Sequence, residues 1–374
     1  MPLAARLNRL VSSPVRDVLA RTAQSDVVSF AGGLPAPDSF PEISSLSVPP
    51  TALQYGPSEG DWPLREHVAA LVTGRGLACT PEQVLILSGS QQGIDLVAKA
   101  TVEVGSCVGV ESPTYLAALQ VFSLFGAEYR PFPVGGEPPA CDLLYVNPTF
   151  QNPTGHCYSA AERERVRAAA ARHGAVLFED DPYHDLCFDP VDQRPIAAGF
   201  DGSWVYQGTF SKSLAPGLRL GYLVASPDLV MPLVQLKQAA DLHTNRVAQH
   251  WVLSLLQASD ADARLEALRA RYRQRRDHFH AVLTEHFSDL ATWDIPSGGL
   301  FFWLRLRTAD CDLDGLLADA LAEGVAFMPG IHFYSAGDEN SSRKTLRLNF
   351  SNASEAEVGS GLVRLAVLLR RSLE

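Results

Sequence analysis

Short apolar runs, each followed by a polar turn and then by helical periodicity, recur along this chain. The stretch VLILSGSQQGIDLVAKA (residues 84–100) is apolar through Leu87, turns at residues 88–90 and continues with apolar side chains at helical spacing. CVGVESPTYLAALQVF (residues 107–122) repeats this plan. We therefore predict a strand, a turn and a helix in each of these two stretches.

A third stretch with the same plan is LLYVNPTFQNPTGHCYSAAERERVRAAAARH, which begins at residue 143. It reaches a helix whose start is marked by Ser159 with Glu162 three residues later, the spacing of a capping box. Three more apolar runs follow, in GAVLFEDDPY, WVYQGTFSK and LRLGYLVASPDLV. Helices that alternate with nearly continuous apolar strands predict an α/β fold, a mostly parallel sheet sandwiched by helices.

Beyond residue 231 the pattern changes to amphipathic helices and a few alternating strands. Residues 235–257 and residues 263–287 each read as one helix, and the second, rich in arginine, predicts a long connecting helix. The segments PSGGLFFWLRLR, GVAFMPGIHFY and TLRLNFSNAS alternate like the strands of a smaller α+β domain.

The chain is long enough for two domains with large cores, since it has 374 residues of which 46% are hydrophobic. We expect a separate N-terminal segment in residues 1–45. A large domain in residues 46–280 then ends in the long helix, and residues 281–374 form the small C-terminal domain.

Charge and composition narrow the class of ligand. A net charge of −11 disfavours nucleic acid as a partner, because contact with its backbone relies on a basic surface. No apolar run approaches the ~20 residues that cross a bilayer, and the N-terminus lacks the apolar region of a signal peptide. The six cysteines and ten histidines lack the spacing of metal ligands or of a disulfide framework. We therefore expect a cytoplasmic protein that binds small molecules and has no metal.

The turns after the predicted strands hold the residues best suited to chemistry. In a largely parallel sheet, ligands bind outside the carboxyl ends of the strands. In chain order, these turns supply Ser90, Gln91, Tyr115, Asn152, Asp180, Tyr183, Thr209, Ser211, Lys212 and Arg219.

Lys212 is one of only four lysines, since the other 27 of the 31 basic residues are arginine. Its amine can form a Schiff base with an aldehyde, while Thr209, Ser211 and Arg219 can donate to a phosphate. The turn TFSKSLAPGLR therefore suits a phosphate-bearing aldehyde. Such neighbours are lacking around Lys99, Lys237 and Lys344.

Other turns suit the remaining parts of such a ligand. Asp180 could keep a pyridine nitrogen protonated and so make the ring an electron sink. Tyr183 and Asn152 could bond the phenolic oxygen of the ring, and Tyr115 could stack on its face. The helix that begins at residues 90 and 91 could favour the phosphate. Plainer roles are also open, because Asp180 could cap the following turn and Tyr115 could be a packing aromatic.

Nine ordered motifs give the chain a clear resemblance. They are VVSFAGGLP, ALQYGPSEGDWPLREHV, SGSQQGIDL, ESPTY, NPTFQNPTG, EDDPY, GTFSKSLAPGLRLGY, SGGLFFW and LRLNFS. Together they resemble the class I and II aminotransferases of fold type I, which use pyridoxal 5′-phosphate. The residues of these motifs are most similar to those of the branch with 2-aminoadipate, kynurenine and aromatic aminotransferases.

The resemblance implies pyridoxal 5′-phosphate as cofactor and an amino acid and a 2-oxo acid as substrates. It places Arg347 at the substrate α-carboxylate, with Gly33 and Asn152 on the other side. The resemblance also implies that residues 1–45 form an arm that contributes to the small domain and to the substrate site. In this arm, Arg16 matches an arginine that can meet an acidic substrate side chain. The tyrosine matching Tyr55 reaches the phosphate of the neighbouring subunit, which implies a homodimer with shared sites. Plainer alternatives are an exposed edge charge for Arg347, a helix-surface pair for Arg16 and a packing role for Tyr55.

The implied reaction is a ping-pong transamination in which Lys212, Asp180 and Tyr183 are the catalytic residues. The amine of Lys212 acts as base at Cα of the amino acid, a 2-oxo acid leaves, and a second 2-oxo acid reverses the sequence. The same residues could serve β-elimination, cyclisation or oxidative chemistry, since the cofactor supplies the difficult step. A non-catalytic, effector-binding protein is the other alternative, although the first motif begins within 30 residues of the N-terminus and leaves little room for a DNA-binding module.

Overall fold

The computed structural model describes residues 3–10, 18, 27–42, 47–307, 311–335 and 344–373. Its largest layer is a seven-stranded sheet in the order β2-β8-β7-β6-β5-β3-β4. Neighbouring strands run parallel except β8, which is antiparallel to both β2 and β7. The strands are β2 (Val84–Leu87), β3 (Cys107–Ser112), β4 (Glu128–Pro133), β5 (Leu143–Val146), β6 (Val176–Asp180), β7 (Trp204–Thr209) and β8 (Gly221–Ala225).

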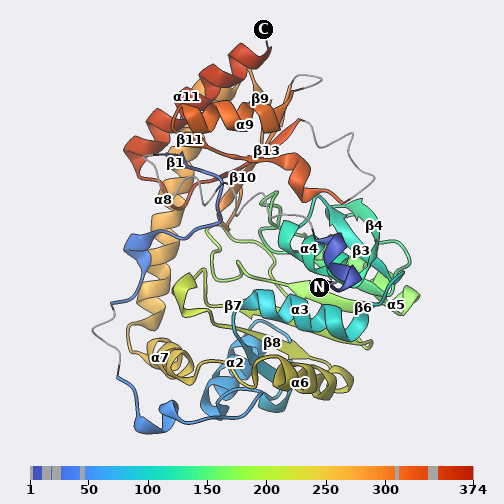
Figure 1. Cartoon of the computed structure of the whole chain (residues 1–374). Coiled ribbons are helices and arrows are strands. Elements are labelled where there is room, and N and C mark those ends of the chain that lie inside the picture. Colours follow the sequence, from blue (N-terminus) through green and yellow to red (C-terminus); the bar gives the residue numbers. More distant parts are fainter. Residues whose placement is uncertain are drawn as a thin grey trace.

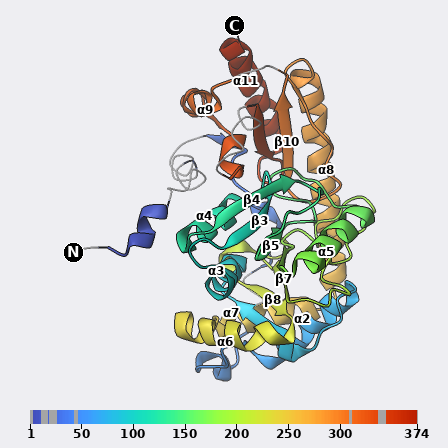
Figure 2. The same cartoon turned by 90° about the vertical axis from the view of Figure 1, so that its right-hand side faces the viewer.

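Helices cover both faces of this sheet because its central strands are apolar on both sides. On β5, Leu143 and Tyr145 face one core, while Leu144 and Val146 face the other. The first core is closed by α3 (Ser90–Thr101), α4 (Leu116–Phe125) and α6 (Pro227–Asp241). The second is closed by α2 (Trp62–Gly74), α5 (Ala160–His173) and α7 (Arg246–Gln257), as Figures 1 and 2 show.

A smaller antiparallel sheet of four strands, in the order β12-β13-β10-β9, lies beyond the carboxyl ends of the large one (Figure 1). Phe279, buried on the long helix α8, lies with its ring centroid 5.4 Å from those of Phe30 and Phe302. The elements of this part are α8 (Ala261–Phe287), β9 (Ala291–Thr292), β10 (Phe301–Leu306), α9 (Leu313–Ala322), β12 (Met328–Pro329), β13 (Thr345–Asn349) and α11 (Glu355–Leu373).

The N-terminal segment joins the smaller part through a two-stranded parallel pairing. In it, β1 (Val28–Ser29) lies beside β11 (Val325–Ala326). Short 3-10 helices complete the described elements: η1 (Ala5–Arg9), η2 (Pro37–Ser39), η4 (Pro50–Leu53), η5 (Pro81–Gln83), η6 (Pro216–Leu218) and η7 (Gly330–Phe333). No helix among the described ranges is long and apolar enough to cross a membrane.

The predicted fold class is confirmed, as are the long helix and the capping box at Ser159. The single helix predicted for residues 235–257 is wrong, because α6 ends at Asp241 and α7 begins at Arg246. Leu242 interrupts the helix with a φ of 64°. The run at 324–334 is two short strands followed by η7. The domain boundaries given above stay a prediction.

Candidate active site

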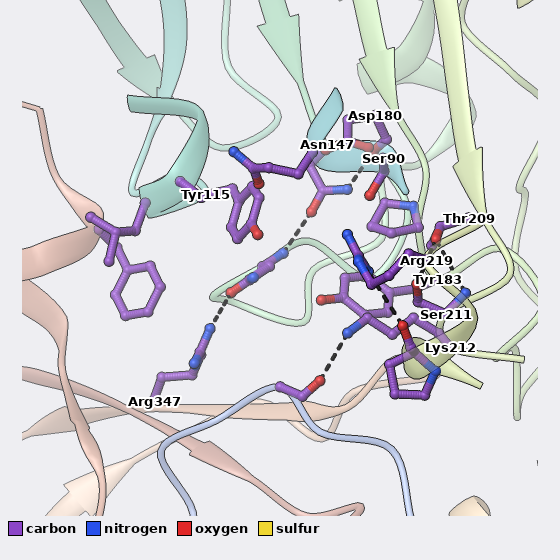
Figure 3. Close-up of a pocket in the computed structure, with 18 residues that line it drawn as sticks. Ser90, Tyr115, Asn147, Asp180, Tyr183, Thr209, Ser211, Lys212, Arg219 and Arg347 are labelled. Atoms are coloured by element: carbon purple, nitrogen blue, oxygen red, sulfur yellow. Dashed lines mark hydrogen bonds between the residues drawn. The ribbon is translucent and has the colours of Figure 1, made fainter. Parts of the chain in front are cut away.

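One cavity of about 400 Å³ collects the predicted residues at the carboxyl ends of the large sheet (Figure 3). It is lined by Gly33, Ser90, Gln91, Tyr115, Leu116, Ala117, Asn147, Asn152, Asp180, Pro182, Tyr183, Thr209, Ser211, Lys212, Pro216, Arg219, Phe333 and Arg347. Two predicted site residues are not in this set. Tyr55 lies elsewhere on the surface, and Arg16 lies outside the described residues.

Lys212 enters the cavity from the turn after β7. The Thr209 hydroxyl shapes this turn, since it accepts from the Ser211 backbone N–H at 3.1 Å and donates to the Ser211 hydroxyl at 3.0 Å. The Lys212 Nζ atom donates to the carbonyl oxygen of Gly33 at 2.8 Å. Burial, and then the charges of Arg347 and Arg219, lower the pKa of the Lys212 amine to about 8. A large share of this amine is therefore neutral, and nucleophilic, near pH 8.

Asp180 is the last residue of β6, and its carboxylate is bonded only by neutral donors among the described residues. Oδ2 accepts from the Tyr145 hydroxyl at 2.8 Å and Oδ1 accepts from Gln207 Nε2 at 2.9 Å. Burial raises the pKa of Asp180 to about 6, although these two hydrogen bonds act in the opposite direction. The group is thus a buried carboxyl, facing the cavity, to which a cationic ligand atom would be a strong partner. These bonds to strand side chains also argue against a mere capping role.

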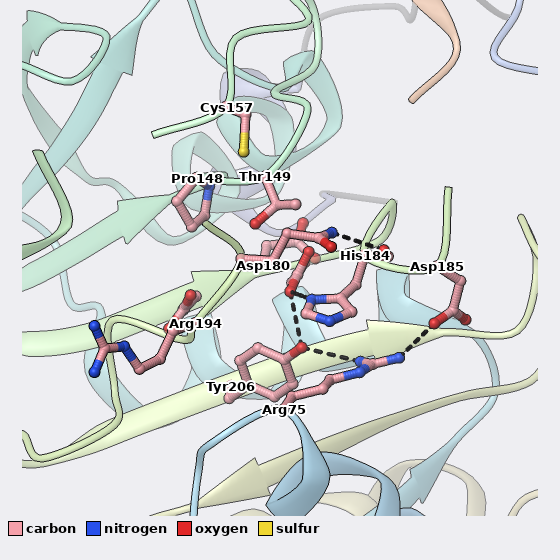
Figure 4. A network of polar contacts seen from close by, with 12 residues as sticks. Arg75, Pro148, Thr149, Cys157, Asp180, His184, Asp185, Arg194 and Tyr206 are labelled. Carbon is pink, nitrogen blue, oxygen red and sulfur yellow. Dashed lines mark hydrogen bonds and ion pairs between the residues drawn. The ribbon is translucent and has the colours of Figure 1, made fainter. Parts of the chain in front are cut away.

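The loop that follows Asp180 is fixed from behind by a polar network (Figure 4). Asp181 Oδ2 lies 2.8 Å from His184 Nδ1 and accepts from the Tyr206 hydroxyl at 2.8 Å. Arg75 donates to Tyr206 at 3.0 Å and to Asp185 at 2.7 Å. Burial tends to raise the pKa of Asp181, but His184 and Arg75 outweigh it and hold that pKa below its usual range. The network leaves Asp180 and Tyr183 little freedom to shift.

The start of α3 and the side chain of Arg219 form the anion-attracting end of the cavity. Ser90 and Gln91 occupy the first turn of α3, where backbone N–H groups lack helical partners. Gly89 precedes them with a φ of 82°, and a Cβ atom there would lie 2.3 Å from Nη2 of Arg219. Only glycine therefore lets the guanidinium of Arg219 approach this turn.

Arg347 extends from β13 into the opposite end of the cavity, where it is 3% exposed. Its guanidinium donates to Asn152 Oδ1 at 2.6 Å and to the Ala31 carbonyl at 2.5 Å, while its Nε atom has no partner. It lies over the rings of Phe301 and Phe333, 4.1 and 4.7 Å from their centroids. Burial lowers the pKa of Arg347 to about 10. The alternative of an exposed edge charge is therefore wrong, and this cation has no carboxylate partner in the described chain.

Tyr183 and Tyr115 border the space between Lys212 and Arg347. Burial raises the pKa of both phenols, to about 12 for Tyr115, and the neighbouring Asp180 adds to the shift at each. The hydroxyl of Tyr183 is hydrogen-bonded to Asn152. Both phenols are thus neutral at physiological pH and can serve as donors.

Tyr55 lies on a loop that is held firmly while its ring is left in solvent. Arg246 Nη1 donates to the carbonyl oxygens of Thr51 and Gln54 at 2.6 and 3.0 Å and so fixes the loop. The Tyr55 side chain is 76% exposed, with the ring of His243 at 5.7 Å. In the described chain this tyrosine does not line the cavity, and its exposure contradicts the alternative of a packing aromatic.

Sequence reasoning missed several residues that line or support the cavity, among them Asn147, Tyr145, Gln207 and Phe333. Asn147 donates to the Asp180 carbonyl oxygen at 2.5 Å and accepts from the Asn152 N–H at 2.7 Å. Asn147 directly follows an apolar strand, and Gln207 is a polar residue within another apolar strand. The sequence pattern could therefore have indicated both residues as candidates for the site. No pattern in the sequence distinguishes Phe333 or Tyr145 from other core aromatics.

The residues present fit pyridoxal 5′-phosphate on their chemistry. The cavity presents an amine of lowered pKa, a buried carboxylate without a cation, and helix N–H groups beside an arginine. These match an aldehyde, a ring nitrogen and a phosphate, in that order. Among the described residues there is no group of three or more histidine, cysteine or acidic side chains that could hold a metal ion.

Comparisons with known proteins agree with this geometry. A family model described as aminotransferase class I and II matches residues 29–365. The chain is 37% identical to a 2-aminoadipate transaminase of Thermus thermophilus, with 97% of this chain and 95% of that protein covered. It is 34% identical to aromatic-amino-acid aminotransferase 1 of Thermococcus litoralis, with 97% and 93% covered. It also matches the crystal structure of an α-aminoadipate aminotransferase from Thermus thermophilus, complexed with N-(5′-phosphopyridoxyl)-L-leucine. That match has a TM-score of 0.87 and 34% identity and covers 99% of this chain and 98% of that chain.

The pKa of Lys212 can be measured through its reaction with pyridoxal, which lacks the phosphate. Cofactor-free protein should form a borohydride-reducible adduct whose rate rises with pH and levels off above a midpoint near 8, because the neutral amine is the nucleophile. Peptide mapping should place the adduct on Lys212. A midpoint close to the ordinary lysine value of about 10.4, or an adduct mainly on Lys99 or Lys344, would contradict the assignment.

Proposed function

Because the chain belongs to the class I and II aminotransferase family, we propose that it moves an α-amino group between an amino acid and a 2-oxo acid, with Lys212, Asp180 and Arg347 as the principal residues. Pyridoxal 5′-phosphate is the cofactor of this transamination. The observation that carries the proposal is the convergence of three groups in one cavity: an amine of lowered pKa, a buried carboxylate without a cation and a buried guanidinium without a carboxylate.

The cofactor, when bound, supplies a ring that withdraws electrons from Cα of the amino acid. Lys212 would attach the cofactor and, once its amine is free, take the proton from Cα through Nζ. Asp180 would hold a proton on the ring nitrogen, and the hydroxyl of Tyr183 together with Asn152 would orient the ring. Ser90, Gln91, Thr209, Ser211 and Arg219 would bind the phosphate, and Tyr115 would cover one face of the ring.

Arg347 would bind the α-carboxylate of the substrate. A guanidinium presents two parallel N–H donors, which match the two oxygens of a carboxylate. Its present partners, Asn152 and the Ala31 carbonyl, are neutral, so a carboxylate would be the stronger acceptor. Gly33 would lie nearby, since a Cβ atom there would come 2.9 Å from the ring of Phe301, over which Arg347 lies.

We propose substrates with apolar or aromatic side chains. Leu116, Ala117, Pro216 and Phe333 line the cavity beside the polar groups. Among the described lining residues, the only cations are Lys212, Arg219 and Arg347, each with a role above. An acidic side chain would need a further cation, such as Arg16. Comparing phenylalanine and leucine with 2-aminoadipate in single-turnover absorbance measurements tests the choice, and a clear preference for 2-aminoadipate would favour the role of Arg16.

We propose a homodimer in which Tyr55 completes the partner's phosphate site. The support is that its loop is held in place while the ring is 76% exposed. Leu53 and Trp62 expose apolar surface nearby in the sequence, at 77% and 43%. We also propose a cytoplasmic location, because all six cysteines are free thiols, as is usual in a reducing compartment.

Replacement of Asp180 tests its role at the ring nitrogen. Asp180→Asn should lower turnover by at least about a hundredfold, the scale of removing one preorganised electrostatic group, while the cofactor stays bound through its phosphate. Turnover and the bound-cofactor spectrum are the measurements. Asp95→Asn, on the exposed face of α3, is the matched control and should behave as wild type. Unchanged turnover in Asp180→Asn would show that the carboxylate has no catalytic part.

Arg347→Lys keeps the positive charge but loses the paired donors. The efficiency of the half-reaction with an amino acid should fall by about 2–4 kcal/mol, whereas simple amines without a carboxylate should lose little. Arg305→Lys is the control, because Arg305 lies on the adjacent strand with a side chain that is 51% exposed. Equal losses for amino acids and amines, or no loss for either, would exclude Arg347 as the carboxylate-binding residue.

Shared sites can be tested by mixing Lys212→Ala, which should be inactive, with Tyr55→Ala, which should be impaired if Tyr55 completes the partner's phosphate site. A hybrid dimer would regain one intact site, so statistical exchange of subunits should restore roughly a quarter of the wild-type sites. Activity before and after exchange is the measurement. If hybrids form, as shown by tagged subunits, and no activity returns, the sites are not shared in this way.

A further inference from the structure

A second lysine is completely buried outside the cavity. Lys237 on α6 has no exposed surface, although lysine is rarely buried unless it is paired. Its Nζ atom donates to Asp241 Oδ1 at 2.8 Å and to Gln92 Oε1 at 3.2 Å. Gln92 lies in the first turn of α3, so this ammonium connects α6 to the start of α3, two helices that lie side by side in Figures 1 and 2.

The partners of Lys237 hold the turn that leads into α3. Asp241 Oδ2 accepts from Gln92 Nε2 at 2.7 Å and from the Ser88 hydroxyl at 3.0 Å. Gln92 Oε1 also accepts from the Ser88 backbone N–H at 2.8 Å. Ser90 and Gln91, which line the cavity, lie between these two anchored residues. The position of the α3 N-terminus is therefore set by this bonded cluster.

The negative charge of Asp241 lies beside the N-terminal turn of α3 and affects anion binding there. Its side chain is 28% exposed, and although burial tends to raise its pKa, hydrogen bonds from Lys237 and Gln92 hold that pKa below the usual range. Asp241 is thus an anion within bonding distance of the first turn of α3, where the helix dipole favours negative charge. Without a nearby cation, this carboxylate would repel a second anion at the same helix end.

We infer that Lys237 is a positioning residue for the phosphate of the cofactor: it cancels the charge of Asp241 and holds the Ser88–Gln92 turn in place. The inference rests on the proposed function, in which Ser90 and Gln91 bind that phosphate. Lys237 itself stays outside the cavity, and its effect passes through Asp241 and Gln92.

The test compares the binding of pyridoxal 5′-phosphate and of pyridoxal to the full chain after removal of the cofactor. Lys237→Met removes the ammonium but keeps much of the side-chain length. It should weaken the affinity for pyridoxal 5′-phosphate by about tenfold, equivalent to 1.4 kcal/mol, and change that for pyridoxal much less. Lys99→Met, on the exposed face of α3, is the matched control and should change neither affinity.

Two further variants separate the effect of charge from a loss of packing. Lys237→Met/Asp241→Asn removes both charges and should recover the part of the lost affinity that is due to the uncancelled charge of Asp241. Asp241→Asn alone leaves the lysine charge unopposed and should bind the phosphate ligand more tightly relative to pyridoxal. The single Asp241 variant also decides the matter if Lys237→Met fails to fold.

The outcomes distinguish this inference from the proposed function. The inference is overturned, while the proposed function stands, if Lys237→Met weakens the affinities for both ligands equally. It is also overturned if the double variant binds pyridoxal 5′-phosphate no better than Lys237→Met and Asp241→Asn binds it no better than wild type. If wild-type protein binds pyridoxal 5′-phosphate no better than pyridoxal, the assignment of Ser90 and Gln91 to the phosphate fails first, and the inference fails with it.

Discussion

Two buried charges of opposite sign that lack charged partners govern this molecule. Asp180 accepts hydrogen bonds only from neutral groups in the described chain, and Arg347 donates only to neutral groups. Burying a charge without a counter-charge lowers the free energy of unfolding, so the rest of the fold must supply the stability that these two groups cost. Under the proposed function, each would become fully paired when a ligand brought the missing charge, a cation to Asp180 and a carboxylate to Arg347. The cavity is in this sense built for its ligands rather than for the stability of the empty protein.

The scaffold holds these groups by dividing them between its two sheets. Asp180 ends strand β6 and Lys212 follows the parallel strand β7, and the network around Arg75 braces both strands. Arg347 comes from β13 of the smaller sheet and is tied by Asn152 to a turn of the larger one. The cavity therefore exists only where the two parts meet. A change that shifts one sheet relative to the other would therefore separate Arg347 from Lys212 and Asp180.

How far the sequence predicted the site depends on the kind of contact. Residues at strand ends, such as Asp180 and Lys212, could be found because parallel strands bring their carboxyl ends to one edge. Contacts such as that of Phe333 with Arg347 depend on how segments distant in the sequence pack together. No local sequence pattern predicts such packing. The break at Leu242 was missed for a similar reason, since the apolar periodicity continues through it. There Asp241 bonds to Ser88, and the Thr244 hydroxyl donates to the Ile86 carbonyl at 3.0 Å, so tertiary bonds override helix propensity.

The scarcity of lysine also acquires a physical meaning in the structure. An arginine carries a planar fork that suits carboxylates and surface pairs, whereas a lysine is a compact point charge whose amine can be neutral. At residue 212 the proposed function requires an amine, and burial favours its neutral form by lowering its pKa to about 8. At residue 237 the enclosed space lies between Asp241 and Gln92, whose oxygens are 2.8 and 3.2 Å from one nitrogen. A guanidinium would have to place several nitrogens and a carbon there, so in a chain that otherwise uses arginine, a small ammonium is the cation that fits.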